Sequence, residues 1–237
     1  MTQTISISPN DRVFVLTGAG ISAESGLPTF RASDGLWAGH RIEDVCTPEA
    51  WESNPALVWE FYSERRAQGR LAHPNPAHIA LAELERKLGD RFFLCTQNVD
   101  DLHERAGSLR LVHMHGELAK SRCSAECGEE PVTDRTVYKD LSAVGRCVCG
   151  ATLRPHIVFF GEIPLEMGRI QTEIAKATVM VVVGTSGSVY PAASFVQWAR
   201  KGGARTIYVG PEPPLNASAF TQVVEGKAGE VLPPLFS

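Results

Sequence analysis

The most chemically suggestive segment is His-Met-His-Gly at residues 113–116. A neutral imidazole binds transition metals, and it also takes up a proton near neutral pH. His113 and His115 are therefore candidates for metal ligands or for a catalytic base, and packing in a core is the third alternative. The spacing of two histidines does not choose among these three. The choice depends on what the rest of the chain brings to them.

Four of the six cysteines form two close pairs, and nineteen residues separate the pairs. In a reducing compartment, close pairs indicate a metal site before they indicate disulfides. Structural zinc takes four tetrahedral ligands, and an all-thiolate set leaves no open coordination position for catalysis. We predict structural zinc, with free thiols as the alternative, on Cys123, Cys127, Cys147 and Cys149. With these thiolates able to fill the site, neither histidine is needed as a zinc ligand.

A glycine-rich segment, Gly-Ala-Gly-Ile-Ser-Ala at residues 18–23, follows the apolar run 12–17. This is the G-x-G-x-x-G/A arrangement, in which glycines let the backbone approach a pyrophosphate at the start of a helix. A tight strand-to-helix turn without a ligand is the alternative. An ordinary dehydrogenase would carry a ribose-binding acid about 20 residues further on. Residues 41–44 lie inside an apparent insertion, so Glu212 is the other candidate for that acid.

Polar side chains gather in Thr-Gln-Asn-Val-Asp-Asp at residues 96–101, at the end of a second apolar run. The carboxyl ends of parallel strands are where α/β folds place ligand-binding groups. The alternative is that Asn98 or Asp100 caps the following helix. Because a helix needs only one cap residue, the segment keeps polar groups for a ligand.

Two further segments each allow a binding role. Tyr62 and Arg65 share a helix face, where a phenol and a guanidinium together could hold a carboxylate. The spacing alone favours an exposed helix face with no ligand. Residues 154–162 contain an apolar extended run after a proline. That run fits either an edge strand that accepts a peptide or a core strand.

Short apolar runs without alternation predict strands that are covered on both faces, as in a parallel α/β sheet. They occupy residues 12–17, 91–96, 178–183 and 205–210. Candidate helices fall between them, at residues 76–88, 167–177 and 192–201. This alternation predicts an α/β fold with a doubly wound, Rossmann-like parallel sheet and a ligand at the carboxyl ends of its strands.

Two segments interrupt the strand-and-helix pattern. Residues 37–75 are rich in aromatic side chains and broken by prolines, and we interpret them as a small helical insertion. Residues 118–153 hold the paired cysteines and little apolar content, and we interpret them as a zinc-binding insertion. The Rossmann-like domain is then expected to comprise residues 1–36, 76–117 and 154–237.

The composition excludes several classes of protein. Of the 237 residues, 43% are apolar and 21% are charged, and the formal net charge is −4. Without a basic excess, nucleic acid is a poor candidate for a partner. The longest apolar run, residues 179–183, is too short to span a bilayer, and the first residues show no signal peptide. We therefore expect a cytoplasmic protein with neither a nucleic-acid nor a membrane partner. We also expect a monomer, although composition does not determine the oligomeric state.

In combination, these motifs resemble those of the sirtuins, the NAD-dependent protein lysine deacylases. The shared segments occur in the family's order, and the likeness runs from residue 12 to about residue 230. They are residues 18–31, 96–103, 113–116, 155–161 and 184–187, together with the four paired cysteines. Each segment is weak evidence alone, but the combination is highly specific.

The resemblance implies three groups of NAD-binding residues. Those for the pyrophosphate and the nearby ribose loop are Gly18, Ala19, Gly20, Ala23, Glu24, Thr29, Phe30, Arg31 and Trp37. Those for the ribose and nicotinamide pocket are Gln97, Asn98, Val99 and Asp100, and those on the adenosine side are Gly184, Thr185, Ser186, Gly210, Glu212 and Ala228. The chain departs from the family at two of these positions, because Thr29 replaces a frequent Asp and Gly210 replaces a usual Asn.

The resemblance also implies the groups that act on the substrate. His115, directly before the glycine, matches the family's catalytic base. A Tyr-x-x-Arg signature marks members that remove succinyl and related acidic groups, and a backbone segment pairs with the substrate peptide. The matching residues are Tyr62, Arg65, Ile157, Val158 and Phe159.

The resemblance therefore implies a reaction. We expect NAD-dependent removal of acetyl, succinyl, malonyl or glutaryl groups from lysine side chains of cytoplasmic proteins, with release of nicotinamide and O-acyl-ADP-ribose. NAD-dependent ADP-ribosyl transfer to proteins is the alternative. A dehydrogenase would share the glycine-rich turn but would not account for the zinc module or the His-Gly pair. A zinc-module protein without catalytic activity would not bind NAD.

Overall fold

Six parallel strands form the central sheet of this computed structural model, which describes residues 7–29 and 36–235. They are β1 (Val13–Thr17), β4 (Phe92–Thr96), β5 (Leu111–His113), β9 (Val179–Val183), β10 (Arg205–Gly210) and β11 (Gln222–Glu225). Their order is β11-β10-β9-β1-β4-β5, which is the doubly wound order 3-2-1-4-5-6 read from the far edge. The four predicted strands are confirmed, and the two edge strands were not predicted.

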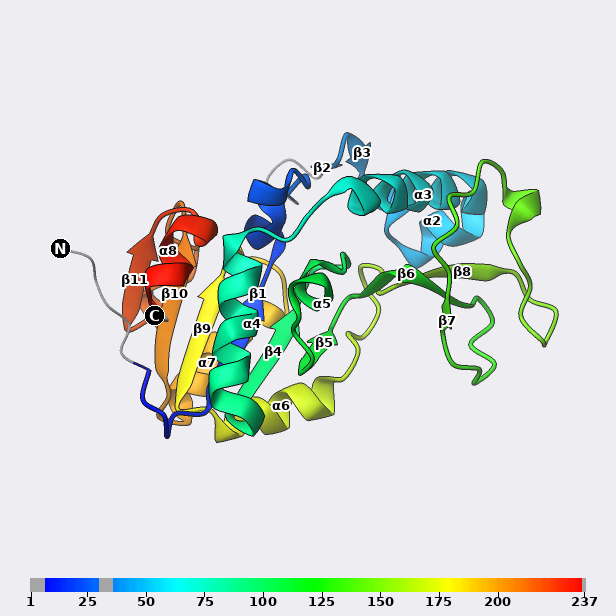
Figure 1. Cartoon of the computed structure of the whole chain (residues 1–237). Coiled ribbons are helices and arrows are strands. Elements are labelled where there is room, and N and C mark those ends of the chain that lie inside the picture. The colour runs from blue at the N-terminus through cyan, green and yellow to red at the C-terminus, as the bar shows by residue number, and fades with distance from the viewer. Residues whose placement is uncertain (1–6, 30–35, 236–237) are drawn as a thin grey trace.

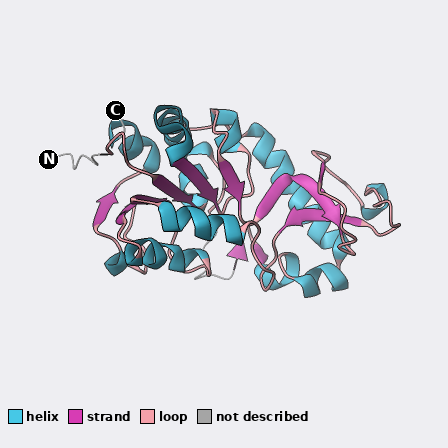
Figure 2. Cartoon of the chain, turned by 90° about the horizontal axis from the view of Figure 1, so that it is seen from below, coloured by secondary structure: helices cyan, strands magenta, loops and turns pink. Residues whose placement is uncertain are grey.

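Helices cover both faces of this sheet, so the predicted fold class is confirmed (Figures 1 and 2). The main ones are α4 (Pro76–Leu88), α6 (Met167–Lys176), α7 (Ala192–Lys201) and α8 (Ala228–Leu235). Alternate residues of β1 point to opposite faces, so Val13 and Val15 pack with α4 and α8. Phe14 and Leu16 pack with α6 and α7. The sheet is therefore buried on both sides, as its unbroken apolar runs predicted.

Local signals fix the start of α4 where the sequence predicted it. Pro76 occupies the first turn, where its missing N–H costs nothing. The side chain of Asn75 accepts the Ala77 N–H at 3.0 Å, and the Asn75 N–H donates to His78 Nδ1 at 3.3 Å. Shorter helical segments complete this half of the molecule. They are η1 (Ala19–Ser25), η2 (Gly89–Arg91), α5 (Leu102–Ala106) and η4 (Ala217–Ala219).

The remaining elements form a second, smaller body beside the sheet (Figure 1). Its helical elements are α1 (Ile42–Val45), α2 (Pro48–Ser53), α3 (Pro55–Leu71) and η3 (Leu141–Ala143). Its strands are β2 (Leu36–Trp37), β3 (His40–Arg41), β6 (Gly116–Cys123), β7 (Val132–Thr133) and β8 (Leu153–Ile157). The last three make an antiparallel sheet in the order β7-β6-β8. Phe61 of α3, Leu118 of β6 and Ile157 of β8 share one core, so the helical and cysteine-bearing segments pack together.

Arg66 fastens α3 to the antiparallel sheet. Its Nε donates to the Leu118 carbonyl at 2.8 Å, and its Nη2 donates to the Lys120 carbonyl and to Ser121 Oγ, each at 3.0 Å. Its Nη1 pairs with the Asp134 carboxylate at 3.1 Å. A buried guanidinium requires such a full set of acceptors. This residue, which the sequence did not single out, sets how α3 lies against β6.

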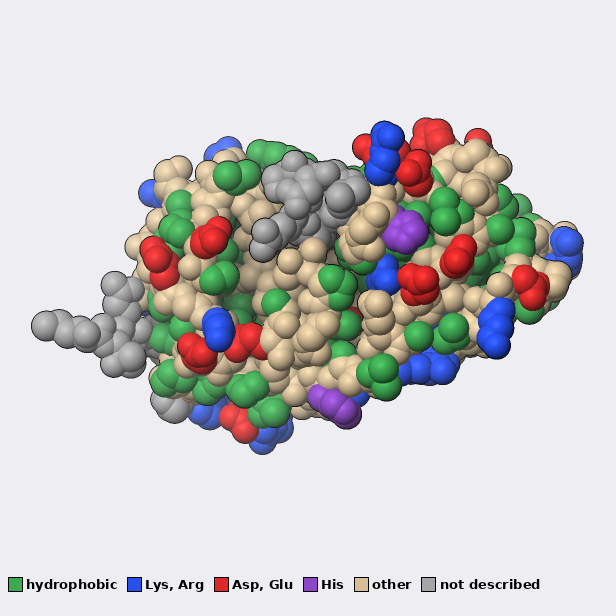
Figure 3. All heavy atoms as spheres, turned by 90° about the horizontal axis from the view of Figure 1, so that it is seen from above, with side chains coloured by type: hydrophobic (Ala, Val, Ile, Leu, Met, Phe, Trp, Pro, Cys, Tyr) green, Lys and Arg blue, Asp and Glu red, His purple; other side chains and the backbone are tan. Residues whose placement is uncertain are grey.

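Two surface features bear on possible partners. Within residues 7–29 and 36–235, no helix combines the length and the apolar character that a membrane span requires. On the face in Figure 3, acidic and basic side chains are interspersed over the part of the chain that the structure describes.

Candidate active site

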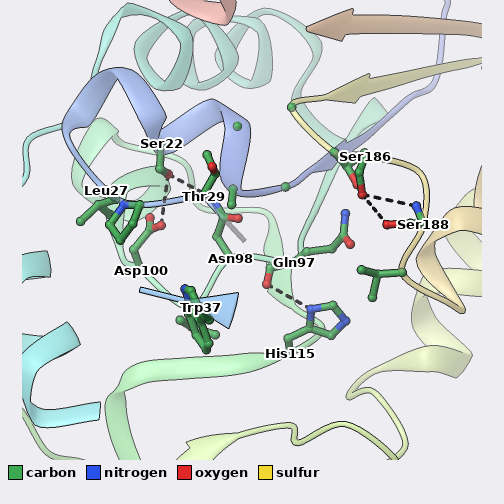
Figure 4. Close-up of a pocket in the computed structure, with 18 of the residues that line it drawn as sticks. Ser22, Leu27, Thr29, Trp37, Gln97, Asn98, Asp100, His115, Ser186 and Ser188 are labelled. Atoms are coloured by element: carbon green, nitrogen blue, oxygen red, sulfur yellow. Dashed lines mark hydrogen bonds between the residues drawn. The ribbon is translucent and has the colours of Figure 1, made fainter. Parts of the chain in front are cut away.

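A cavity of about 900 Å³ lies at the carboxyl ends of the paired strands β1 and β9. In a doubly wound sheet this is the topological switch point, where the connections leave for opposite faces and open a crevice. The cavity continues to α3 and to the end of β8. It therefore joins the central sheet to the smaller body, and Figure 4 shows part of its lining.

Three glycines bring two loops into direct contact at this switch point. The Gly20 N–H donates to the Gly184 carbonyl at 2.8 Å, and the Gly18 N–H donates to the Val183 carbonyl at 3.0 Å. A Cβ on Gly20 would lie 2.7 Å from Gly184 Cα. These glycines are thus required for loop-to-loop packing, before any ligand is considered. The helix that follows is the 3₁₀ helix η1 rather than an α-helix.

His113 does not line the cavity, and both of its ring nitrogens form hydrogen bonds. Its Nδ1 is 2.8 Å from the Asn98 carbonyl, and its Nε2 is 2.7 Å from the Glu104 carboxylate. Because a backbone carbonyl and an ionised carboxylate both accept hydrogen bonds, these two contacts favour the ring with protons on both nitrogens. Burial disfavours that charge, but the hydrogen bond and the charge of Glu104 outweigh it and raise the pKa of His113.

His115 has the opposite environment, because it lines the cavity (Figure 4). Its Nδ1 is 3.2 Å from the Gln97 carbonyl, which can only accept, so the proton lies on Nδ1 and Nε2 keeps its lone pair. Burial lowers the pKa of His115 and keeps the ring neutral. His115 is therefore the histidine that can take up a proton from a molecule in the cavity.

The strand-end cluster contributes both a hydrogen bond to the start of α5 and cavity groups. Asp100 Oδ1 accepts the N–H of Leu102, the first residue of α5, at 3.2 Å, although the N-cap position itself is Asp101, whose side chain makes no capping hydrogen bond. Its other oxygen accepts the Ser22 hydroxyl at 3.1 Å, and Asn98 Nδ2 donates to the same hydroxyl at 3.0 Å. Burial raises the pKa of Asp100. Ser22 thus joins the glycine-rich segment to the strand end, a link that the sequence alone did not reveal.

Tyr62 and Arg65 are both buried, so the interpretation of an exposed helix face is wrong. Arg65 lines the cavity, and its Nε and Nη2 donate to Gln68 at 3.2 Å and to Glu64 at 3.1 Å. Its Nη1 is buried and has no hydrogen-bond partner among the described residues. The Tyr62 hydroxyl donates to Cys46 Sγ at 3.1 Å.

This arrangement of glycine loops, strand-end amides and a cavity histidine matches a known family. The Sir2 family model matches residues 18–191. The chain belongs to the Sir2 family. A curated relative from Pasteurella multocida, "NAD-dependent protein deacylase", is 51% identical in an alignment 231 residues long that covers 94% of this chain and 95% of that protein.

Solved structures of Sir2 proteins share the fold. A Sir2 homologue in complex with NAD has a TM-score of 0.87 and 41% identity, covering 96% of this chain and 89% of that one. A mutant Sir2 homologue in complex with 2'-O-acetyl ADP ribose has a TM-score of 0.86 and 40% identity, covering 96% and 92%.

Most of the predicted NAD-binding residues of this Sir2 protein do line the cavity. They are Gly18, Ala19, Gly20, Ala23, Thr29, Trp37, Gln97, Asn98, Val99, Asp100, Gly184, Thr185, Ser186 and Glu212. Among the described residues, Gly210 and Ala228 do not line it, and neither does Glu24. The Glu24 carboxylate accepts the Gly229 N–H at 2.8 Å, at the start of α8. Phe30 and Arg31 lie outside the described residues.

The predicted substrate segment of this Sir2 protein lines the cavity at Ile157, Val158 and Phe159. It continues β8, which is an edge strand of its sheet. The Val158 N–H already donates to the His115 carbonyl at 2.9 Å, and the Phe159 N–H donates to the Glu162 carboxylate at 2.7 Å. Pairing with a substrate backbone stays a prediction, and it requires other backbone groups of this segment.

The four paired cysteines converge at the end of β6, as a metal site requires. The Sγ atoms of Cys123 and Cys149 are 3.5 Å apart, as are those of Cys127 and Cys147. All four sulfur atoms lie within 4.8 Å of one another. Tetrahedral zinc with Zn–S bonds of about 2.3 Å places its sulfur atoms about 3.8 Å apart. The donor set fits structural zinc, and neither His113 nor His115 belongs to it.

Several cavity residues were missed by the sequence analysis. Besides Ser22, they include Cys46, Gln68, Gly69, Leu118, Glu162, Ser188, Val189, Tyr190, Tyr208 and Leu215. Most lie in the segments that follow β8 and β9 or on α3. Two of them carried a sequence signal, because Ser22 lies in the glycine-rich segment and Glu162 lies in residues 154–162, which had been singled out as a possible peptide-binding strand.

Proposed function

We propose that this protein is an NAD-dependent protein lysine deacylase that removes acetyl and acidic acyl groups, namely succinyl, malonyl or glutaryl. The acyl oxygen displaces nicotinamide from the ribose carbon of NAD, and water is consumed as the acyl group passes to the ribose, so the products are the free lysine side chain, nicotinamide and O-acyl-ADP-ribose. One observation carries the proposal. His115, neutral and with its Nε2 free to accept a proton, stands where the cavity joins the glycine loops of the sheet to the end of β8. The names of the relatives and the ligands of the solved Sir2 structures support it.

Different residues along the cavity have different roles in the proposed reaction. Bound NAD supplies an electrophilic ribose carbon and a leaving group, nicotinamide. The loops at Gly18–Gly20 and Gly184–Ser186, which line the cavity, would hold its phosphate and adenosine side, and Asn98 and Asp100 would contact the nicotinamide side. His115 takes the proton from a ribose hydroxyl, which makes that oxygen a nucleophile toward the acyl carbon. The Gln97 carbonyl keeps the His115 ring in the required tautomer and orientation.

Arg65 is the basis for including acidic acyl groups. Its Nη1 is buried at the cavity with no partner among the described residues, and leaving such a donor unpaired is costly. A carboxylate at the end of an acyl chain would satisfy that donor with a charge-assisted hydrogen bond. An acetyl group offers no such interaction, so it relies on the apolar lining alone.

Mass spectrometry of acyl-peptides tests the function. Peptides of one sequence that carry acetyl-, succinyl- or glutaryl-lysine are incubated with the protein, with and without NAD. We expect NAD-dependent loss of the acyl group, with one O-acyl-ADP-ribose formed per lysine released. ADP-ribosylated protein without O-acyl-ADP-ribose would favour the ADP-ribosyltransferase alternative. The expectation of a monomer that acts on cytoplasmic proteins stays a prediction.

Substitution of each histidine tests the assignment of the base. His115→Ala is expected to lower kcat by roughly 10²–10⁴-fold, the usual contribution of a general base, while the NAD-induced rise in Tm remains. His113→Ala removes no cavity group, so its loss of kcat is expected to be far smaller. Equal losses of kcat from the two substitutions would contradict the assignment.

A further inference from the structure

The thiol of Cys46 holds a fixed position at the end of α1. The Cys46 N–H donates to the Ile42 carbonyl at 2.8 Å, and the Cys46 carbonyl accepts the Phe160 N–H at 2.9 Å. This backbone pairing ties α1 to the segment that follows β8, so Cys46 is anchored to the predicted substrate segment. Its Sγ accepts the Tyr62 hydroxyl at 3.1 Å.

Cys46, and not Tyr62, forms the wall of the cavity at this point. Cys46 and Arg65 line the cavity, whereas Tyr62 is completely buried and does not line it. The phenol ring is held edge-to-face against Phe61 and Trp37, with centroids 5.0 and 6.1 Å away. The sulfur therefore covers the Tyr62 hydroxyl from the cavity.

Both groups of this pair are neutral. Burial raises the pKa of Cys46 to about 11 and also raises that of Tyr62. The thiol is thus a poor nucleophile, and it acts as a wall and a hydrogen-bond acceptor. Sulfur accepts weakly, whereas a carboxylate accepts a phenol hydrogen bond strongly. The Tyr62 hydroxyl is therefore paired with a weak partner and shielded from a strong one.

We propose that Cys46 determines the choice between neutral and acidic acyl groups in this chain, by covering the Tyr62 hydroxyl and leaving Arg65 as the exposed member of the Tyr-x-x-Arg pair. This inference rests on the proposed deacylase function. Acidic acyl groups are then recognised mainly by the guanidinium, and the phenol shapes the pocket from behind the thiol. Removal of the Cys46 thiol would expose the Tyr62 hydroxyl, so that it can donate a hydrogen bond to the acyl carboxylate.

Cys46→Ala tests this inference through a ratio of specificities. The ratio of kcat/KM for succinyl-lysine to kcat/KM for acetyl-lysine is measured on matched peptides. We expect it to rise about tenfold or more, because one added hydrogen bond to a charged group contributes about 1.5–3 kcal/mol. Adding Tyr62→Phe should abolish the rise, since the gain comes from the phenol hydroxyl.

Cys95→Ala is the matched control for loss of a buried thiol. Cys95 is 0% exposed, lies in β4 and does not line the cavity. Its substitution should leave the ratio unchanged. An unchanged ratio in Cys46→Ala, or an increase that persists with Tyr62→Phe, overturns the inference while the deacylase function stands. Absence of NAD-dependent loss of every acyl group overturns both.

A second comparison applies even if Cys46→Ala fails to fold. In the otherwise native chain, Arg65→Met should lower kcat/KM for succinyl-lysine by a larger factor than Tyr62→Phe, because only the guanidinium reaches the cavity. If Tyr62→Phe lowers it as much as Arg65→Met, the hydroxyl already contacts the acyl group, and the inference is wrong.

Discussion

At the scale of single residues, a turn separates the roles of His113 and His115. β5 ends at His113, and the turn at Met114 and His115 carries the chain into β6 at Gly116. Gly116 has φ of +89°, and a Cβ there would collide with the His156 carbonyl. The glycine is therefore needed to make the turn that carries His115 to the cavity, while His113 stays beside α5.

The acid limb of the pH–rate profile distinguishes the two rings. Because burial lowers the pKa of His115, its neutral form persists below pH 6.5 and is lost as pH falls through that lowered pKa. We expect kcat/KM for acetyl-lysine to hold down to below pH 6.5 and then to fall. The pKa of His113 is raised, so dependence on neutral His113 would move the limb above pH 6.5. His113→Gln should leave the limb in place.

At the scale of elements, the contact between two loops carries the NAD side of the site. The loop after β1 and the loop after β9 meet through Gly20 and Gly184, which has φ of +62°. The strands place these loops together because β1 and β9 pair in register, Thr17 opposite Val183. The conformation of the glycine-rich loop thus depends on a segment more than 160 residues away along the chain.

Gly20→Ala tests that contact. The new methyl group meets the Gly184 backbone, so we expect a loss of about 1–3 kcal/mol in the free energy of unfolding and weaker NAD binding. Gly168→Ala in α6 is the control, because nothing lies within 4 Å of a Cβ there. It should be neutral or stabilising by up to about 1 kcal/mol. Urea unfolding of both variants measures the difference, and equal stabilities would contradict this account.

At the scale of the whole molecule, the smaller body supplies the acyl end of a cavity whose other end belongs to the parallel sheet. α3, β6 and β8 share a core, and Arg66 fastens α3 to β6. The four cysteines close the outer loops of the same body. Zinc there would act through structure, because the thiolates leave no coordination position for a reactant.

Loss of the zinc ligands should therefore affect the acyl end more than the NAD end. We expect Cys147→Ser to remove bound zinc, to lower Tm and to raise KM for the acyl-peptide more than KM for NAD. Cys95→Ala serves as the control, with unchanged zinc content. Metal analysis and steady-state kinetics check both variants. Full zinc content in Cys147→Ser would show that the four thiolates are not a single site.

The sequence by itself determined the features that depend on local order. Four core strands followed from unbroken apolar runs, and α4 followed from the near-helical spacing of its apolar residues, because neighbouring residues set these patterns. The four cysteines and the glycine-rich segment were recognisable from type and spacing. The resemblance already pointed to His115, and the tertiary structure supplied the reason, because His115 lines the cavity and His113 does not. The tertiary structure alone decided that Cys46 covers Tyr62 and that Ser22 joins Asp100. Each of these features depends on side chains from segments far apart in the sequence. Tertiary packing sets the orientation of these side chains, and a local sequence pattern does not predict it.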